Sequence, residues 1–137
     1  MGKSQRDKGA SGERAVVKLL TEHGYRAKRT AQLQAGGVEE LPGDVTIFGT
    51  KDEEWPSDRW IAIEVKRDQA VNLHTKALHS AMEQYGDGIG CVFWKQDRKR
   101  WSLSCWAYGQ LATFDALLVL EETADLGAWL LDVRGER

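Results

Sequence analysis

The stretch "WIAIEVKRDQ", residues 60–69, decides the fold because it reads as a buried β-strand and yet carries two charges. Its other strand residues are of the aromatic and β-branched types that favour a packed sheet, namely Trp60, Ile61, Ile63 and Val65. Side chains alternate along a strand, so Glu64 and Lys66 share one face, with α-carbons about 6.6 Å apart. Both side chains can then reach one ion or one substrate atom. A plain salt bridge would need the same geometry.

The sequence around this strand predicts an α/β domain with five strands. Hydrophobic spacing, capping residues and turn residues predict a helix over 11–23, strands over 25–29 and 44–49, the strand from Trp60, a helix over 73–85, strands over 89–94 and 101–107, and a mostly helical remainder over 110–131. The strands form a central mixed sheet that is flanked by the helices. Residues 1–9 are expected to be a flexible basic arm, and residues 10–137 a single domain.

Composition limits the class of protein. The chain has 137 residues, of which 42% are hydrophobic and 29% charged, enough for one domain with a real core. It has no apolar stretch of membrane length and no apolar signal segment, so we expect a soluble cytoplasmic protein without membrane partners. Cys91 and Cys105 lack a C-x-x-C partner and are interpreted as buried small hydrophobic residues.

Charge is unevenly distributed along the chain. Through residue 30 there are eight basic and three acidic residues, whereas residues 31–66 have eight acidic and three basic ones. A basic segment beside an acidic one is typical of a protein that faces a polyanion and holds its metal ion. An ordinary solvated surface with chance clustering is the alternative.

Two further carboxylates are expected near Glu64. Asp44 opens the strand that follows Pro42 and Gly43, and hairpin-like pairing brings it beside the Glu64 strand. Glu13 shares a helical face with apolar residues three, four and seven positions later, so it needs a cation, a donor network or a metal nearby. The alternative is that Glu13 simply lies at the helix start, where the helix dipole and solvent accommodate it.

Three carboxylates and a lysine suit a hard divalent ion. Oxygen ligands of this kind prefer Mg²⁺, for which Mn²⁺ is expected to substitute, and no small-molecule cofactor is expected. A metal ion there would polarise a phosphate and lower the pKa of water, while Lys66 would stabilise the developing charge. The reaction indicated is phosphodiester hydrolysis.

Two sequence motifs resemble known nucleases. "GD" at residues 43–44 and "IEVK" at 63–66 resemble the signature of the PD-(D/E)XK nuclease superfamily, with Gly43 in place of the motif's proline. More narrowly, "GASGERAVVKLLTEHGY" at residues 9–25 is similar to the archaeal-type Holliday junction resolvases. The resemblance implies a restriction-endonuclease-like domain. It also implies site roles: Asp44, Glu64 and the Val65 carbonyl as metal ligands, Lys66 as the catalytic lysine, and Glu13 as a direct or outer metal carboxylate.

The function expected from this resemblance is Mg²⁺-dependent resolution of four-way DNA junctions by paired cuts, which requires a homodimer. Four tryptophans in the C-terminal half supply either a dimer interface or core: Trp94, Trp101, Trp106 and Trp129. The residues expected to bind DNA phosphates are Lys3, Arg6, Lys8, Arg29 and Arg67. Another nuclease of the same fold, acting on linear or single-stranded DNA in restriction, repair or phage DNA processing, would have an identical site. A catalytically idle DNA-binding protein is the more distant alternative.

Overall fold

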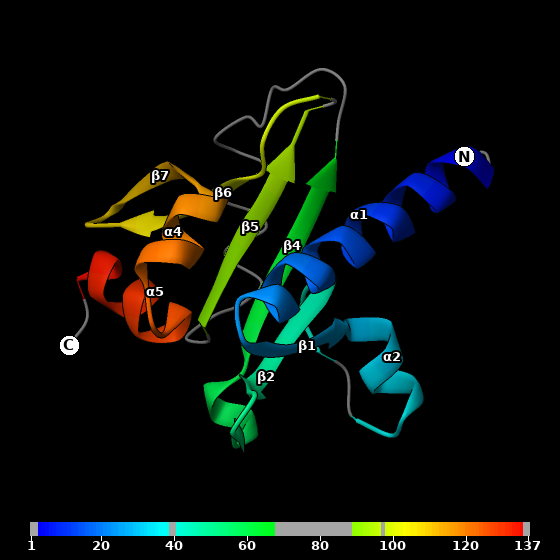
Figure 1. The fold of residues 1–137 in the computed structure, drawn as a ribbon, viewed down its shortest axis with the longest axis horizontal. Coiled ribbons are helices and arrows are strands. Elements are labelled where there is room, and N and C mark those ends of the chain that lie inside the picture. The colour runs from blue at the N-terminus through cyan, green and yellow to red at the C-terminus, as the bar shows by residue number, and fades with distance from the viewer. Residues whose placement is uncertain (1–2, 39–40, 68–88, 97, 136–137) are drawn as a thin grey trace.

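A computed structural model describes residues 3–38, 41–67, 89–96 and 98–135 (Figure 1). It has the expected α/β class, with a central mixed sheet and packed helices. The helix predicted over 73–85 lies outside the described residues. Among the described residues, no helix has both the length and the apolar character needed to cross a membrane.

Within the described residues, the sheet has seven strands. They are β1 (Tyr25–Arg29), β2 (Val45–Thr50), β3 (Glu53–Glu54), β4 (Ile61–Arg67), β5 (Ile89–Lys95), β6 (Ser102–Ala107) and β7 (Gln110–Asp115). Their order is β1-β2-β4-β5-β6-β7, and the short β3 pairs with β2. Among the strands that the structure describes, only β4 and β5 pair in parallel, and the other pairs are antiparallel. The C-terminal ends of β4 and β5 therefore lie side by side at one end of the sheet.

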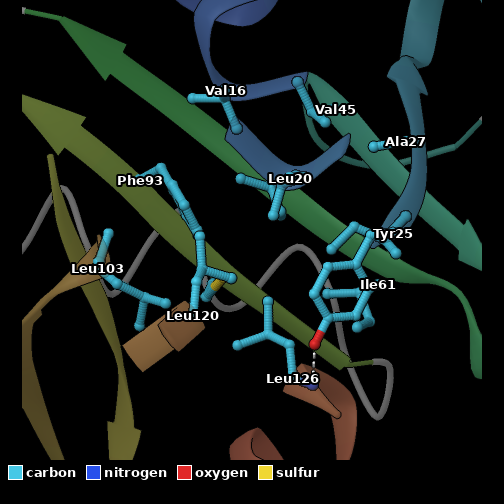
Figure 2. Packing of buried hydrophobic residues seen from close by; sticks show 14 of the residues in the cluster. Val16, Leu20, Tyr25, Ala27, Val45, Ile61, Phe93, Leu103, Leu120 and Leu126 are labelled. Carbon is cyan, nitrogen blue, oxygen red and sulfur yellow. Dashed lines mark hydrogen bonds between the residues drawn. The ribbon is translucent and has the colours of Figure 1, made fainter. Parts of the chain in front are cut away.

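Three of the described helices, those at residues 3–22, 116–122 and 126–134, pack on one face of this sheet. The helical elements are α1 (Lys3–Glu22), α2 (Thr30–Ala35), a 3₁₀ turn (Ser57–Arg59), α4 (Ala116–Glu122) and α5 (Leu126–Arg134). Buried residues of α1, α4 and α5 join one core cluster with the inward side chains of β4, β5 and β6 (Figure 2). A smaller cluster around Val92 lies apart from this core and includes Ala62, Trp94, Trp106 and Leu111.

The prediction of five strands is wrong by two. β3 is an added pair of residues, and β7 occupies the first part of the segment predicted to be helical. The two-residue loop before β7, Tyr108 and Gly109, has φ values of 50° and 84°. Positive φ at both loop positions is the geometry of a type I′ turn, whose twist fits a tight hairpin. Hairpin pairing with β6 thus prevails over the helical spacing that the sequence shows there.

The N-terminal helix is longer than predicted. α1 begins at Lys3, not after Ser11, so most of the segment expected to be a flexible arm is helical. Lysine, arginine and glutamine are good helix formers, and extending an existing helix requires no new nucleus. A second short helix, α2, lies in the segment between β1 and β2 that was predicted to be a loop.

The core includes two polar contributions that matter for its integrity. Cys91 and Cys105 are free thiols in the core, as predicted, and burial raises the pKa of Cys105 to about 12. The Tyr25 hydroxyl oxygen accepts a hydrogen bond of 2.8 Å from the Leu126 N–H (Figure 2). This bond ties the start of α5 to the edge strand β1.

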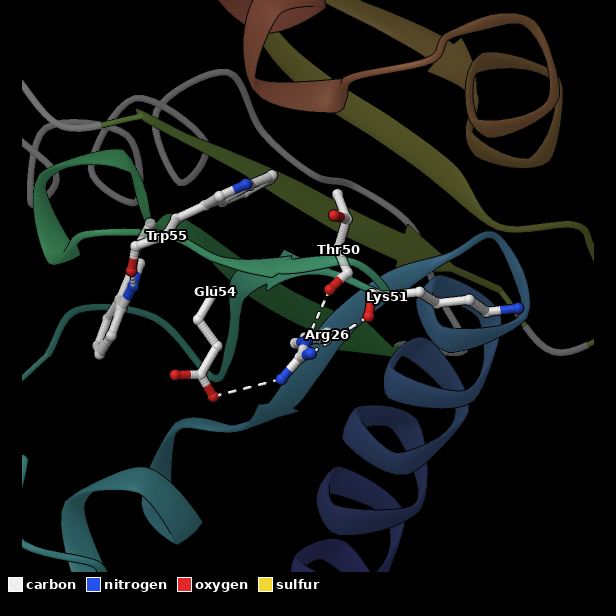
Figure 3. A network of polar contacts seen from close by, with 6 residues as sticks. Arg26, Thr50, Lys51, Glu54 and Trp55 are labelled. Atoms are coloured by element: carbon white, nitrogen blue, oxygen red, sulfur yellow. Dashed lines mark hydrogen bonds and ion pairs between the residues drawn. The ribbon is translucent and has the colours of Figure 1, made fainter.

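Arg26, near the start of β1, holds the turn that follows β2. Its Nε donates to the Thr50 carbonyl at 2.6 Å and its Nη2 to the Lys51 carbonyl at 3.2 Å, while its Nη1 pairs with Glu54 at 3.4 Å (Figure 3). These contacts satisfy backbone carbonyls at a sheet edge. The role of Arg26 is therefore structural.

Candidate active site

Glu64 and Lys66 point to the same side of β4, as the strand alternation predicts. Their neighbours Ile61 and Ile63 are fully buried on the opposite side, against the helices. The Lys66 Nζ lies 3.8 Å from the Glu64 Oε1. The Glu64 side chain is 19% exposed and the Lys66 side chain 44%, so solvent screens this pair and it adds little stability. A half-exposed lysine held beside a carboxylate remains available to a ligand.

Asp44 is clamped onto β4. Its N–H donates to the Ile63 carbonyl at 2.8 Å, and its Oδ2 accepts the Val65 N–H at 2.9 Å. The β2–β4 register ends with Val45 opposite Ile63. Asp44 itself precedes β2 and is outside this register, but its two hydrogen bonds hold it beside Ile63 and Val65, the neighbours of Glu64 in β4. The prediction that Asp44 lies beside the Glu64 strand is confirmed.

The Val65 backbone completes this arrangement. Within an extended strand, the N–H and the C=O of one residue point to the same side. The Val65 N–H points to Asp44, so the Val65 carbonyl also faces the side of β4 on which β2 begins. The Asp44 carboxylate and the Val65 carbonyl thus lie on the same side of β4, next to the start of β2, and Glu64 directly precedes Val65 in the chain.

Gly43 is required by the backbone that delivers Asp44. Its φ is +83°, and a Cβ at this position would lie 3.0 Å from the Ile63 carbonyl oxygen and 3.1 Å from the Ile63 nitrogen. Proline fixes φ near −65°, so the proline of the motif cannot occupy this position. Glycine here allows the close approach of two strands that places Asp44 on Val65.

We expect Gly43→Ala to destabilise the protein by about 2 to 4 kcal/mol, because left-handed strain and overpacking against Ile63 add together. Gly37→Ala is the matched control, since Gly37 has a φ of +102° and open space around it. It should cost only the strain, about 1 to 2 kcal/mol. Urea unfolding measures both free energies. Equal losses would show that the approach of Gly43 to Ile63 is not tight.

Glu13 is not buried alone in the core. Its Oε1 lies 3.1 Å from the Arg29 Nε, and both side chains are about one-quarter exposed or less. Arg29 is opposite Val45 in the β1–β2 register, and the Thr30 N–H donates to the Asp44 carbonyl. The cation expected beside Glu13 is thus Arg29. Arg29 pairs with Val45, the residue that follows Asp44 in the chain.

The expected group of three carboxylates is not assembled in the part of the chain that the structure describes. There, no three acidic, histidine or cysteine side chains come together as a possible metal cluster. The reason is local: Arg29 holds Glu13, whereas Val65 orients Asp44. A direct metal contact of Glu13 stays a prediction.

The residues expected to bind DNA are in different situations. Lys3, Arg6 and Lys8 fall in α1, but their side chains lie outside the described ones. Arg29 is engaged by Glu13. Arg67 ends β4 on the side of α1, where its side chain lies against Gly12. Their phosphate contacts stay a prediction.

The tryptophans contribute mainly to the fold. Trp101 and Trp129 pack against the main core, whereas Trp94 and Trp106 pack in the smaller cluster around Val92. Among the described residues, the large hydrophobic side chains that are well exposed are Tyr108 and Leu118, and neither is a tryptophan. The four tryptophans are only partly buried, so they contribute to the packing of the fold and a dimer interface stays a prediction.

A further cationic segment lies between two of the predicted strands, and no motif in the sequence assigns it a role. The turn "KQDRKR", residues 95–100, connects β5 to β6 and carries Lys95, Arg98, Lys99 and Arg100. Four cations in six residues, directly after a strand parallel to the Glu64 strand, was the signal for a binding surface. The sequence alone did not show that β4 and β5 end side by side.

Comparisons with known proteins find similar solved structures but no matching family. No protein-family model matches the sequence, and no curated protein matches it. Among the solved structures that resemble the chain is Hjc of Archaeoglobus fulgidus, a Holliday junction resolvase from an archaeal hyperthermophile. It is 20% identical, the match covers 75% of this chain and 83% of that one, and the TM-score is 0.42. That protein is of the type which the motifs resemble, but values this low do not establish a family for this chain.

Proposed function

We propose that the chain is a metal-dependent endodeoxyribonuclease. It hydrolyses phosphodiester bonds where the start of β2 lies beside the C-terminal half of β4. The observation that carries this proposal is the clamp of Asp44 on the Val65 N–H beside the Glu64 and Lys66 pair. In the proposed site, the two carboxylates and the Val65 carbonyl hold the metal ion, and the accessible Lys66 ammonium group faces the phosphate. The matching "GD" and "IEVK" motifs support the same chemistry.

The donor set fits Mg²⁺, with Mn²⁺ as a substitute. Asp44, Glu64 and the Val65 carbonyl offer only oxygen atoms, which hard divalent cations prefer, and leave room for water and a phosphate oxygen. The bound ion would supply polarisation of the phosphate and a lowered pKa of water. The hydrogen bond from the Val65 N–H orients the Asp44 carboxylate before any ligand arrives.

Lys66 performs the remaining electrostatic task. Its ammonium group is on the face shared with Glu64 and is half exposed, so it can donate to a non-bridging phosphate oxygen. A fixed positive charge there stabilises the charge that develops in the transition state. Glu64 keeps Lys66 near the site by their ion pair.

We further propose that the substrate is a four-way DNA junction, cut by a twofold-symmetric homodimer. The sequence of residues 9–25 supports this finer assignment through its resemblance to the resolvases. Two symmetric cuts need two active sites related by a twofold axis, which an isologous dimer provides. Light scattering of the purified protein tests the dimer.

The substrate is tested by incubating the protein and Mg²⁺ with a four-way junction, a splayed duplex and a plain duplex of equal length. We expect paired nicks in the junction and a rate on it well above the other two. Equal cleavage of all three, or a monomer in solution, would replace the resolvase by a general DNA nuclease with the same Asp44, Glu64 and Lys66 chemistry. Cleavage of none would end the nuclease proposal.

Glu13→Gln is expected to lower activity most at low Mg²⁺ and to be partly rescued by more ion. The change removes a negative charge one residue along the sheet from Asp44, which weakens the attraction for a cation without removing an Asp44 or Glu64 ligand. Glu22→Gln is the control, since Glu22 is exposed at the far end of α1. A Mg²⁺ titration with the wild-type midpoint would leave Glu13 only its structural pairing with Arg29.

A further inference from the structure

The turn between β5 and β6 holds its cations on an ordered scaffold. The Lys99 N–H donates to the Gln96 carbonyl at 3.1 Å and closes the turn. At its base, the Lys95 Nζ lies 5.8 Å from the centre of the Trp101 ring. On the other flank, the Arg100 Nε lies 3.0 Å from the Asp115 Oδ2. Both flanks of the turn are therefore fastened to the sheet.

The tip of this turn presents two cations to solvent. Arg98 and Lys99 are exposed, and no hydrogen bond or ion pair of their side chains is found with the described residues. Arg98 has a φ of +65°, a left-handed conformation that glycine, asparagine and aspartate adopt far more readily than arginine. A long cationic side chain at such a position costs stability, and nothing in the described fold uses it.

The tip of the turn lies at the same end of the strands as the proposed site. In the parallel register Lys66 is opposite Trp94 and Arg67 opposite Lys95, directly before the turn (Figure 1). The strand spacing and rise place the α-carbon of Arg98 within roughly 18 Å of that of Lys66. This reach corresponds to about five base pairs of duplex DNA. One DNA arm can therefore contact both places.

We propose that Arg98 and Lys99 bind the phosphate backbone of a duplex arm of the DNA whose scissile bond lies at Glu64 and Lys66. The inference rests on the proposed nuclease function and assigns its substrate-binding surface to a turn outside the metal site. Lysine and arginine contacts to phosphates position DNA and carry little sequence information. The turn therefore sets affinity and register, with no base preference.

Counterion release gives this surface a specific readout. Each phosphate neutralised by a protein cation contributes about 0.9 to the slope of log affinity against log salt for duplex DNA. Removal of both tip cations should therefore reduce the magnitude of that slope by about two and weaken all duplex sequences alike.

The test is fluorescence anisotropy of a labelled plain duplex, titrated with protein at several salt concentrations in EDTA, so that no cleavage occurs. The test variant is Arg98→Gln with Lys99→Gln. The control is Arg59→Gln with Lys51→Gln, which removes the same two charges from exposed residues near the opposite end of the sheet. Thermal melting checks that each variant remains folded.

We expect the tip variant to lose about two units of slope and the control to keep the wild-type slope. A wild-type slope in the tip variant, or an equal loss in the control, overturns the assignment of the turn. Wild-type protein that binds duplex without any salt dependence overturns it as well. Failure of the nuclease proposal is distinguishable, because protein that binds through this turn and yet never cleaves DNA with Mg²⁺ retains the surface and loses only the catalytic site.

Discussion

Glu64→Gln is expected to reduce DNA cleavage about a hundredfold or more while leaving the fold intact. Glutamine has the shape of glutamate but lacks the charge that a divalent cation needs from its ligand. The change also removes the carboxylate that lies 3.8 Å from the Lys66 Nζ. Since that pair is solvent-screened, its loss should change the melting temperature little. Single-turnover cleavage and thermal melting measure the two effects separately.

Glu53→Gln is the matched control for this variant. Glu53 is an exposed strand residue of the same sheet, and it pairs with Arg59 at 3.3 Å. Its replacement removes the same charge and should leave cleavage unchanged. If Glu64→Gln cuts at a rate close to that of the wild type, Glu64 has no place in the active site.

The second large effect is expected at Asp44, where two replacements separate charge from structure. Asp44→Asn retains an oxygen that accepts the Val65 N–H, so it should abolish cleavage with little loss of stability. Asp44→Ala leaves that N–H without its acceptor, so its free energy of unfolding should be about 1 to 3 kcal/mol lower than that of Asp44→Asn. Cleavage assays and urea unfolding of the two variants give the comparison.

Loss of the Asp44 carboxylate also reduces charge repulsion with the nearby Glu64. Asp44→Asn is therefore expected to melt no lower than the wild type when metal is absent, and it should gain less than the wild type from added Mg²⁺. The same stabilisation by Mg²⁺ in both proteins would contradict a ligand role for Asp44. Equal stability of Asp44→Asn and Asp44→Ala would contradict the structural role of its hydrogen bond.

The strands beside the proposed active site were predictable because their sequences show local patterns. Ile61, Ile63 and Val65 alternate with Ala62, Glu64 and Lys66, and the structure buries Ile61 and Ile63 completely. The β7 strand was not predictable in this way, since its apolar spacing also suits a helix. What decides there is the type I′ turn at Tyr108 and Gly109, which depends on a non-glycine residue with a positive φ.

The site was predictable only in part. Strand alternation placed Glu64 and Lys66 on one face, and the turn before Asp44 indicated its position. The partner of Glu13 depends on which residue of β1 lies under α1, and that residue proved to be Arg29. Likewise, the position of the Arg98 turn follows from the parallel pairing of β4 and β5. Such long-range placements depend on tertiary packing and leave no local pattern.

The most direct test of the central claim is single-turnover cleavage of one labelled four-way junction by the wild-type protein, with Mg²⁺ and with EDTA, beside Glu64→Gln with Mg²⁺. If Asp44, Glu64 and Lys66 form the site, the wild-type protein cleaves the junction with Mg²⁺, and the other two reactions show no detectable cleavage. Cleavage that persists in EDTA, or equal cleavage by Glu64→Gln, would contradict a metal-dependent nuclease site at this edge of the sheet.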